Sequence, residues 1–191
     1  MTRLILAKPG STETPDQAAR LANELACLLD QIHTEQLGFD QLQSLVPDDF
    51  AAHWQITLDF LTILTDAWPK FLEAEGILDP TERRNRLLKM RAAIWQNSPP
   101  TETIIAAGST GSIPATAELL STIARLPQGA VILPGLDLNM DDTSWNQLEP
   151  THPQFSMARL LRQMDVPRSD VAYWPVALSD VDISRTHFVN A

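Results

Sequence analysis

The sequence predicts an α/β fold in which a helical lobe, residues 1–98, precedes a small α/β lobe, residues 99–191. The first half carries apolar residues at the three- and four-residue spacing of helices. The second half contains two short apolar runs, separated by a helical pattern, and each run ends near a glycine. The order strand–helix–strand with short connections indicates parallel strands. We therefore expect a partial parallel sheet with flanking helices.

The first long helix is expected to begin at Thr14-Pro15-Asp16-Gln17. This segment supplies a cap, a proline in the first position and a glutamine three residues after the cap. Gly38 is expected to close the region. Cys27 lies within the apolar pattern, and we expect a buried small hydrophobic side chain rather than a nucleophile. The expected apolar face comprises Ala18, Leu21, Ala22, Leu25, Leu28, Leu29 and Ile32.

Three further helices are expected in the first lobe. A short one covers about 41–45. A longer one begins with the proline and acids of 46–49 and continues until Pro69 kinks or interrupts it, because proline removes a hydrogen bond and clashes with the preceding turn. The third starts at the cap signal of 79–82 and reaches about Gln96.

The second lobe is expected to contain two buried strands, a third strand and three helices. The strands are 103–107, 130–134 and 171–174. The helices are 114–126, with Ala117, Leu120, Ile123 and Ala124 on its inner side, 141–145 and 153–164. Two or three parallel strands are few for a sheet whose central strands need covering on both faces. We therefore expect an excised segment, with the rest of the sheet supplied by other sequence.

Composition narrows the function classes. Hydrophobic residues make up 44% and charged residues 20% of the chain, and no apolar run approaches the roughly 20 residues of a membrane span. A cytoplasmic protein without membrane association is the expectation. The single cysteine excludes an internal disulfide and an all-cysteine metal site within one copy of the chain. The net charge of −10 argues against an autonomous DNA-binding module, so DNA contact requires a local patch or a surrounding assembly.

One expected helix concentrates five of the chain's 14 basic residues. These residues are Arg83, Arg84, Arg86, Lys89 and Arg91. They form a candidate phosphate-contacting patch, and the alternative is a solvated helix face. Trp54, Trp68 and Trp95 recur in the same lobe, where large aromatic side chains are most often core, although an exposed one could stack on a base.

A small-residue turn stands where the first strand gives way to a helix. Backbone amides and hydroxyls there could hold a phosphate. No lysine follows, so the turn is not a Walker A loop, and it is not a dinucleotide fingerprint. The alternative is a tight turn before Pro114 whose glycines satisfy backbone geometry. The turn comprises Gly108, Ser109, Thr110, Gly111 and Ser112.

Asp137 follows the second expected strand, in the region where α/β sheets place their sites. With Asp141 and Asp142 it could bind a magnesium ion. The favoured alternative is that Asp141 and Asp142 cap or begin the next short helix while Asp137 hydrogen-bonds a turn. The histidines show no pairing at metal-ligand spacing. They are His33, His53, His152 and His187.

Several segments together resemble AddB proteins of the alphaproteobacterial type, and the similarity spans most of the chain. In the second lobe they are IIAAGSTGSIPATAELL at 104–120, IARLPQGAVILPGLD at 123–137, Trp145 and His152-Pro153-Gln154. In the first lobe they are His53-Trp54, TLDFL at 57–61, Ala67-Trp68-Pro69, Leu78-Asp79-Pro80 and Arg83-Arg84-Asn85.

The resemblance implies one subunit of a heterodimeric helicase–nuclease that resects broken DNA ends for recombination. The chain would be an internal fragment of the helicase-like half, and its α/β lobe part of a P-loop NTPase-type core. ATP, the nuclease magnesium and the iron–sulfur cluster would belong to the rest of the complex, with no cofactor here. Ser109 stands where motor helicases of this class carry an acid, and the downstream glutamine is missing.

The expected function is therefore a scaffold and DNA-path element without an active site. Its expected partners are an AddA-type helicase–nuclease subunit and, through the complex, DNA. The alternative is an independent α/β enzyme or binding protein for a phosphorylated small ligand, which would use the turn 108–112 and Asp137.

Overall fold

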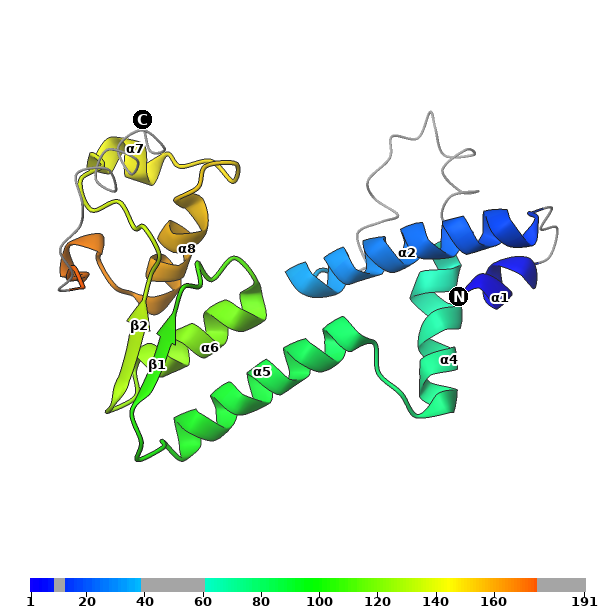
Figure 1. Cartoon of the computed structure of the whole chain (residues 1–191), viewed down its shortest axis with the longest axis horizontal. Coiled ribbons are helices and arrows are strands. Elements are labelled where there is room, and N and C mark those ends of the chain that lie inside the picture. Colours follow the sequence, from blue (N-terminus) through cyan, green and yellow to red (C-terminus); the bar gives the residue numbers. More distant parts are fainter. Residues whose placement is uncertain (9–12, 39–60, 175–191) are drawn as a thin grey trace. The chain divides into compact units, whose positions relative to one another are not determined.

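The structure is a computed structural model that describes residues 1–8, 13–38 and 61–174. Contacts divide the chain into two compact units, Met1–Arg86 and Leu87–Ala191 (Figure 1). The boundary falls inside one helix, whereas the expected lobes meet at residue 98. The helix expected at 41–45 and most of the one that begins at 46–49 lie outside the described residues.

Helices α1 (Thr2–Leu6) and α2 (Pro15–Glu35) begin the first unit. The predicted start of α2 is confirmed, because Gln17 Oε1 accepts the backbone N–H of Thr14 at 2.9 Å. The helix ends with Gln36 in the left-handed conformation, at φ 55°. The cap therefore falls on a glutamine rather than on Gly38.

The inward face of α2 is narrower than the sequence indicated. Ala18, Ala22, Leu25 and Leu29 are buried, whereas Cys27 is exposed. The prediction of a buried Cys27 is thus wrong. Cys27 lies two positions from both Leu25 and Leu29, which places it on the opposite side of a helix with 3.6 residues per turn.

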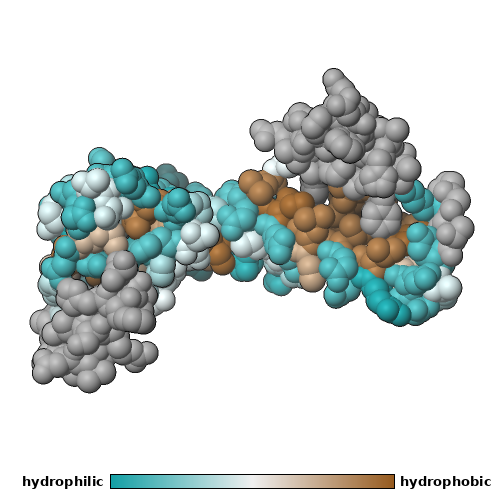
Figure 2. Space-filling model, turned by 90° about the horizontal axis from the view of Figure 1, so that it is seen from above, coloured by the Kyte–Doolittle hydropathy of each residue, from teal (hydrophilic) through white to brown (hydrophobic). Residues whose placement is uncertain are grey.

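A π-helical segment, Ile63–Ala67, leads directly into α4 (Trp68–Glu75), whose second residue is Pro69. The wider turn confirms the interruption expected at this proline, which lacks an N–H and crowds the preceding turn. Trp68 packs against the core of the unit, as expected for a large aromatic side chain. That core consists of Ile5, Ala18, Ala22, Leu25, Leu29, Ile63 and Leu64. Apolar side chains also gather on the face of this unit shown in Figure 2.

Helix α5 (Pro80–Asn97) begins where its sequence signal predicted. Asp79 Oδ1 accepts the backbone N–H of Thr81 at 2.9 Å and that of Glu82 at 3.3 Å. These bonds satisfy two of the amide groups that the first turn of a helix leaves free. The aspartate therefore fixes the start of α5.

In the second unit, β1 (Ile104–Ala107) and β2 (Gly129–Ile132) pair in parallel, with Ile104 opposite Gly129. Helix α6 (Pro114–Ala124) connects them (Figure 1). The predicted strand–helix–strand order and the parallel pairing are confirmed. Within the described ranges the sheet has these two strands.

The prediction of a third strand at 171–174 is wrong. A 3₁₀ turn, Arg168–Asp170, precedes this segment, and residues 171–174 have no ladder partner in the part of the chain that the structure describes. It lines an apolar groove instead. The described chain is thus mixed α/β and mostly helical, with one small parallel sheet.

The two strands are less buried than expected, because the described helices cover one face of the sheet. Exposure alternates along β1, and Ile105 is 55% exposed. Ala117, Leu120 and Ile123 of α6 are buried as predicted, but Ala124 is exposed. It is the last residue of α6.

Two more helices complete the second unit, α7 (Asp142–Asn146) and α8 (Phe155–Met164), close to their expected bounds. Met164 and Leu160 of α8 meet Leu120 and Ala117 of α6 in the core of this unit. Across the described ranges, none of the helices has the length and apolar character needed to cross a membrane.

Candidate functional site

The first turns of α5 are fixed to the end of α2 by buried polar side chains. Asp79 and Asn85 are 6% and 7% exposed. The ring Nδ1 of His33 lies 3.1 Å from Asp79 Oδ1, and Asn85 Nδ2 donates to the carbonyl of His33 at 2.7 Å. Thr81 Oγ1 donates to Asp30 Oδ1 at 2.8 Å. His33 therefore has a structural role, and the opposite side of α5 is left toward solvent.

Three of the predicted phosphate-contacting residues lie in these first turns of α5, within the unit Met1–Arg86. Arg83, Arg84 and Arg86 are all exposed. Arg84 donates to Thr34 Oγ1 at 3.2 Å, and Arg86 forms an ion pair with Glu82. An exposed pair of this kind contributes little stability, so a phosphate could displace the carboxylate at small cost.

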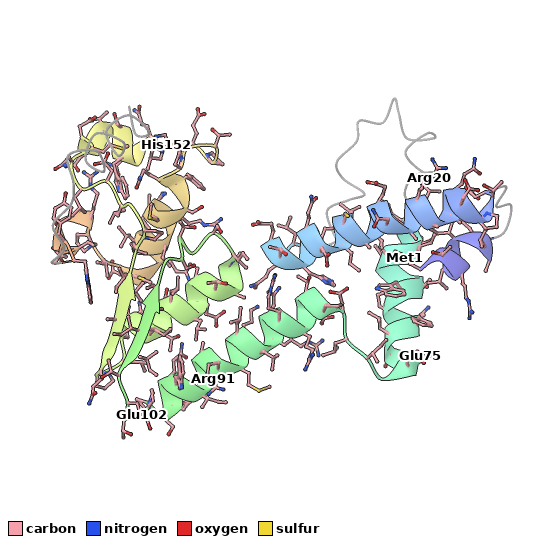
Figure 3. All side chains as sticks on the ribbon, viewed as in Figure 1. Met1, Arg20, Glu75, Arg91, Glu102 and His152 are labelled. Carbon is pink, nitrogen blue, oxygen red and sulfur yellow. The ribbon has the colours of Figure 1, made fainter. Side chains whose placement is uncertain are left out.

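The other two predicted residues lie in the second unit, beside an apolar stripe. Leu87, Met90 and Ile94 recur at three- and four-residue spacing and are 53%, 58% and 49% exposed. Lys89 and Arg91 are exposed on either side of this stripe. The guanidinium of Arg91 lies 5.5 Å from the ring centroid of Trp95, a cation–π contact that holds the arginine along the helix (Figure 3).

The glycine turn between β1 and α6 is shaped by packing. Gly108 and Gly111 have φ of 79° and 66°. A Cβ on Gly111 would lie 2.8 Å from Leu160 Cδ2. The backbone N–H of Gly111 donates to Ser109 Oγ at 3.3 Å, and Arg159 donates to the carbonyl of Ser112. Both glycines therefore satisfy backbone geometry, as the structural alternative predicted.

The loop after β2 uses its carboxylates for local structure. Asp137 Oδ1 accepts the backbone N–H of Asn139 at 2.8 Å and that of Met140 at 3.1 Å. Asp141 Oδ1 caps α7 by accepting the N–H of Ser144 at 2.9 Å. This bond lowers the pKa of the Asp141 carboxyl below its usual value, because it stabilises the charged form.

Asp142 completes this pattern by pairing with Arg168 at 2.8 Å, and that guanidinium lies 4.6 Å from the ring centroid of Trp145. The structural alternative for Asp137, Asp141 and Asp142 is confirmed by these bonds. The three carboxylates each have a partner of their own. Within the described ranges no three His, Cys, Asp or Glu side chains converge as a metal site.

These loops surround an open cavity of about 920 Å³. Among the described residues that line it, Asp137, Asp141, Glu149 and His152 have ionisable side chains, and none is a lysine or an arginine. His152, in the loop between α7 and α8, accepts the N–H of Gln154 at Nδ1, at 3.1 Å (Figure 3). The neutral ring therefore carries its proton on Nε2. The turn 108–112 does not line this cavity, so Asp137 and that turn do not form a joint site here.

The role of Gln154, which connects the loops around the cavity, was not predicted from the sequence. Gln154 is 3% exposed, and its Nε2 donates to the carbonyl of Gly135 at 2.9 Å. Its Oε1 accepts the N–H of Asp137 at 3.1 Å. Its side chain bonds a distant loop and does not cap α8, so no local sequence pattern marks its role.

Comparisons with family models, with curated proteins and with solved structures gave no match to this chain.

Proposed function

We propose that the chain is a non-catalytic segment of the AddB-type subunit of an ATP-dependent helicase–nuclease, and that it serves as scaffold and DNA-path element. The segments that resemble AddB include Leu78-Asp79-Pro80 and Arg83-Arg84-Asn85. In the structure these residues form the fixed start of α5. Its partner is an AddA-type subunit, and its α/β unit is part of a larger helicase-like core in the cytoplasm.

The observation that carries the proposal is that the start of α5 combines buried polar side chains with exposed arginines. Asp79 and Asn85 are buried against α2, while Arg83, Arg84 and Arg86 are exposed. A helix start held in this way presents its guanidinium groups without a large loss of backbone freedom. Arginine suits phosphate contacts because its planar group donates several hydrogen bonds.

The acidic net charge of the chain limits its affinity for DNA. With a net charge of −10, the full chain repels DNA as a whole. A local cluster therefore yields weak, salt-sensitive binding by itself, and the remaining positive charge must come from the assembly.

The test is fluorescence anisotropy of a labelled DNA duplex with the full chain over a range of salt. Weak binding that fades with salt is expected. Arg83→Ala, Arg84→Ala and Arg86→Ala combined should lower the slope of log K against log salt by about 3, since each phosphate contact contributes close to 0.9. Equal binding by this triple variant would contradict the assignment of the patch.

A matched control removes three positive charges elsewhere in the same unit. Arg3, Arg20 and Lys70 are exposed, and the last two form exposed ion pairs with Asp16 and Asp66. Their replacement by alanine changes the net charge by the same amount. This control should retain the salt slope of the unchanged chain, which separates a local contact from overall charge.

The rival function, binding of a phosphorylated small ligand at Asp137, meets unfavourable electrostatics. The cavity presents Asp137, Asp141 and Glu149, and none of the described lining residues is a lysine or arginine that would balance their charge. Thermal-shift measurements with nucleotides and sugar phosphates should therefore show no stabilisation. A rise in Tm that Asp137→Ala abolishes would instead establish the rival.

A further inference from the structure

The outer edge of β2 carries backbone groups without partners. Ile104 donates its N–H to the carbonyl of Gln128 at 3.0 Å, and Gly108 donates to that of Ile132 at 3.1 Å. Alternate residues of a parallel strand direct their N–H and C=O groups to the same neighbour. The N–H and C=O of Val131 therefore point away from β1. Within the described part of the chain, nothing pairs with them.

An apolar groove of about 460 Å³ lies at that edge. Residues 131–133 form one wall, and the segment 171–174, at the β2 side of the sheet in Figure 1, forms another. Leu136 contributes to the lining, and none of the described residues that line the groove is charged. Tyr173 and Trp174 are 61% and 57% exposed. The groove thus combines a free ladder edge with apolar and aromatic walls.

We propose that this groove binds an extended, uncharged peptide segment of a partner protein, which adds to the sheet as a strand beside β2. The backbone of the segment would pair with the N–H and C=O of Val131. Its alternate apolar side chains would pack against Leu136 and the ring of Trp174 or Tyr173. The inference does not depend on the proposed contact between α5 and DNA.

The chemistry of the groove selects this occupant over others. An edge strand presents donors and acceptors at the spacing of another strand, whereas a helix has no free backbone groups to offer along its length. A charged ligand would lose its hydration without gaining a charged partner among the described lining residues, which are all uncharged. A two-stranded sheet is also marginal without further pairing or packing, so an added strand stabilises the unit.

The experiment uses the full chain and a fluorescently labelled eight-residue peptide of alternating valine and threonine, with binding followed by anisotropy. The matched probe has the same side chains but N-methyl groups on alternate backbone nitrogens, which block strand pairing. We expect the unmodified peptide to bind at least about tenfold more tightly than the methylated one. Equal affinity for both peptides, or no binding of the unmodified peptide, would overturn the proposal.

Two variants locate the site. Val131→Pro removes the N–H at the free edge, where proline is tolerated because that N–H takes no part in the ladder with β1. Tyr173→Glu places a charge in the groove at an exposed position, so it keeps the proposal testable if the proline variant does not fold. Each should weaken peptide binding about tenfold. Unchanged affinity in a folded Tyr173→Glu chain would place the peptide elsewhere and overturn the proposal.

Sedimentation of the chain alone decides between a partner protein and a second copy. We expect a monomer, with the groove free for the peptide. A dimer that Tyr173→Glu dissociates would show that a second copy of this chain occupies the groove, which contradicts the proposed partner.

Discussion

The turn after β1 and the loop after β2 occupy equivalent places in a parallel sheet, yet they differ in what they leave open. Gly111 packs on Leu160, and Arg159 covers the carbonyl of Ser112, so the first turn is closed by α8. The second loop is hydrogen-bonded to Gln154 at the start of α8 and borders a cavity of about 920 Å³. Position at a strand end therefore does not by itself create a site, because neighbouring side chains decide whether space remains.

The largest expected loss of stability comes from a substitution in the turn after β1. Gly111→Ala combines a left-handed backbone, at φ 66°, with a Cβ placed 2.8 Å from a buried leucine. We expect a loss of about 3 kcal/mol in the free energy of unfolding, from backbone strain and overpacking together. Urea denaturation followed by circular dichroism measures it.

Gly108→Ala is the matched control for this substitution. Its φ is 79°, but a Cβ there has nothing within 4 Å. The backbone strain alone should cost about 1 kcal/mol. If both variants lost the same stability, close packing on Leu160 would not be what closes the turn.

A smaller loss of stability is expected when the hydrogen bonds that hold the loop after β2 are removed. Gln154→Ala leaves the carbonyl of Gly135 and the N–H of Asp137 without their partners. The expected loss is about 2 kcal/mol, because part-buried polar groups lose hydrogen bonds. Thermal unfolding of this variant and of Gln147→Ala, an exposed glutamine in the same region, gives the comparison. Equal Tm values would exclude Gln154 as the residue that holds the loop.

The smallest effect concerns the pH dependence of the second loop. The pKa of Asp141 is lowered in the folded chain, so its contribution to stability is present above the ordinary pKa of 3.8 and is lost as pH falls through the lowered value. Asp141→Asn retains an oxygen that can accept from Ser144 but does not titrate. Its Tm should therefore fall less than that of the unchanged chain between pH 6 and pH 3, on the scale of these pKa values. A parallel fall in both chains would show that Asp141 makes no pH-dependent contribution.

The sequence predicted features that depend on neighbours in the chain. The starts of α2 and α5 follow from Thr14 and Asp79, whose capping bonds join residues two or three positions apart. The local roles of Asp137 and Asp141 were likewise among the stated alternatives. Parallel pairing followed from the order and the short connections of the elements.

Features that depend on distant contacts could not be predicted in this way. The burial of Gln154 joins the start of α8 to a loop that precedes α7, and no local pattern marks it. The segment 171–174 has an apolar sequence suited to a strand. Arg168, just before it, instead forms an ion pair with Asp142 and a cation–π contact with the ring of Trp145. An apolar run supplies the side chains of a strand without supplying a ladder partner.

The exposure of Cys27 has a practical consequence. It is the chain's single cysteine, on the side of α2 opposite its buried residues. A maleimide dye or a spin label will therefore attach at one known position without disturbing the core. Such a probe on α2 lies in the unit that contains Arg83, Arg84 and Arg86, so quenching by labelled DNA can be read from a fixed reference point. The same thiol calls for a reductant during purification, because two exposed cysteines can oxidise to a disulfide between chains.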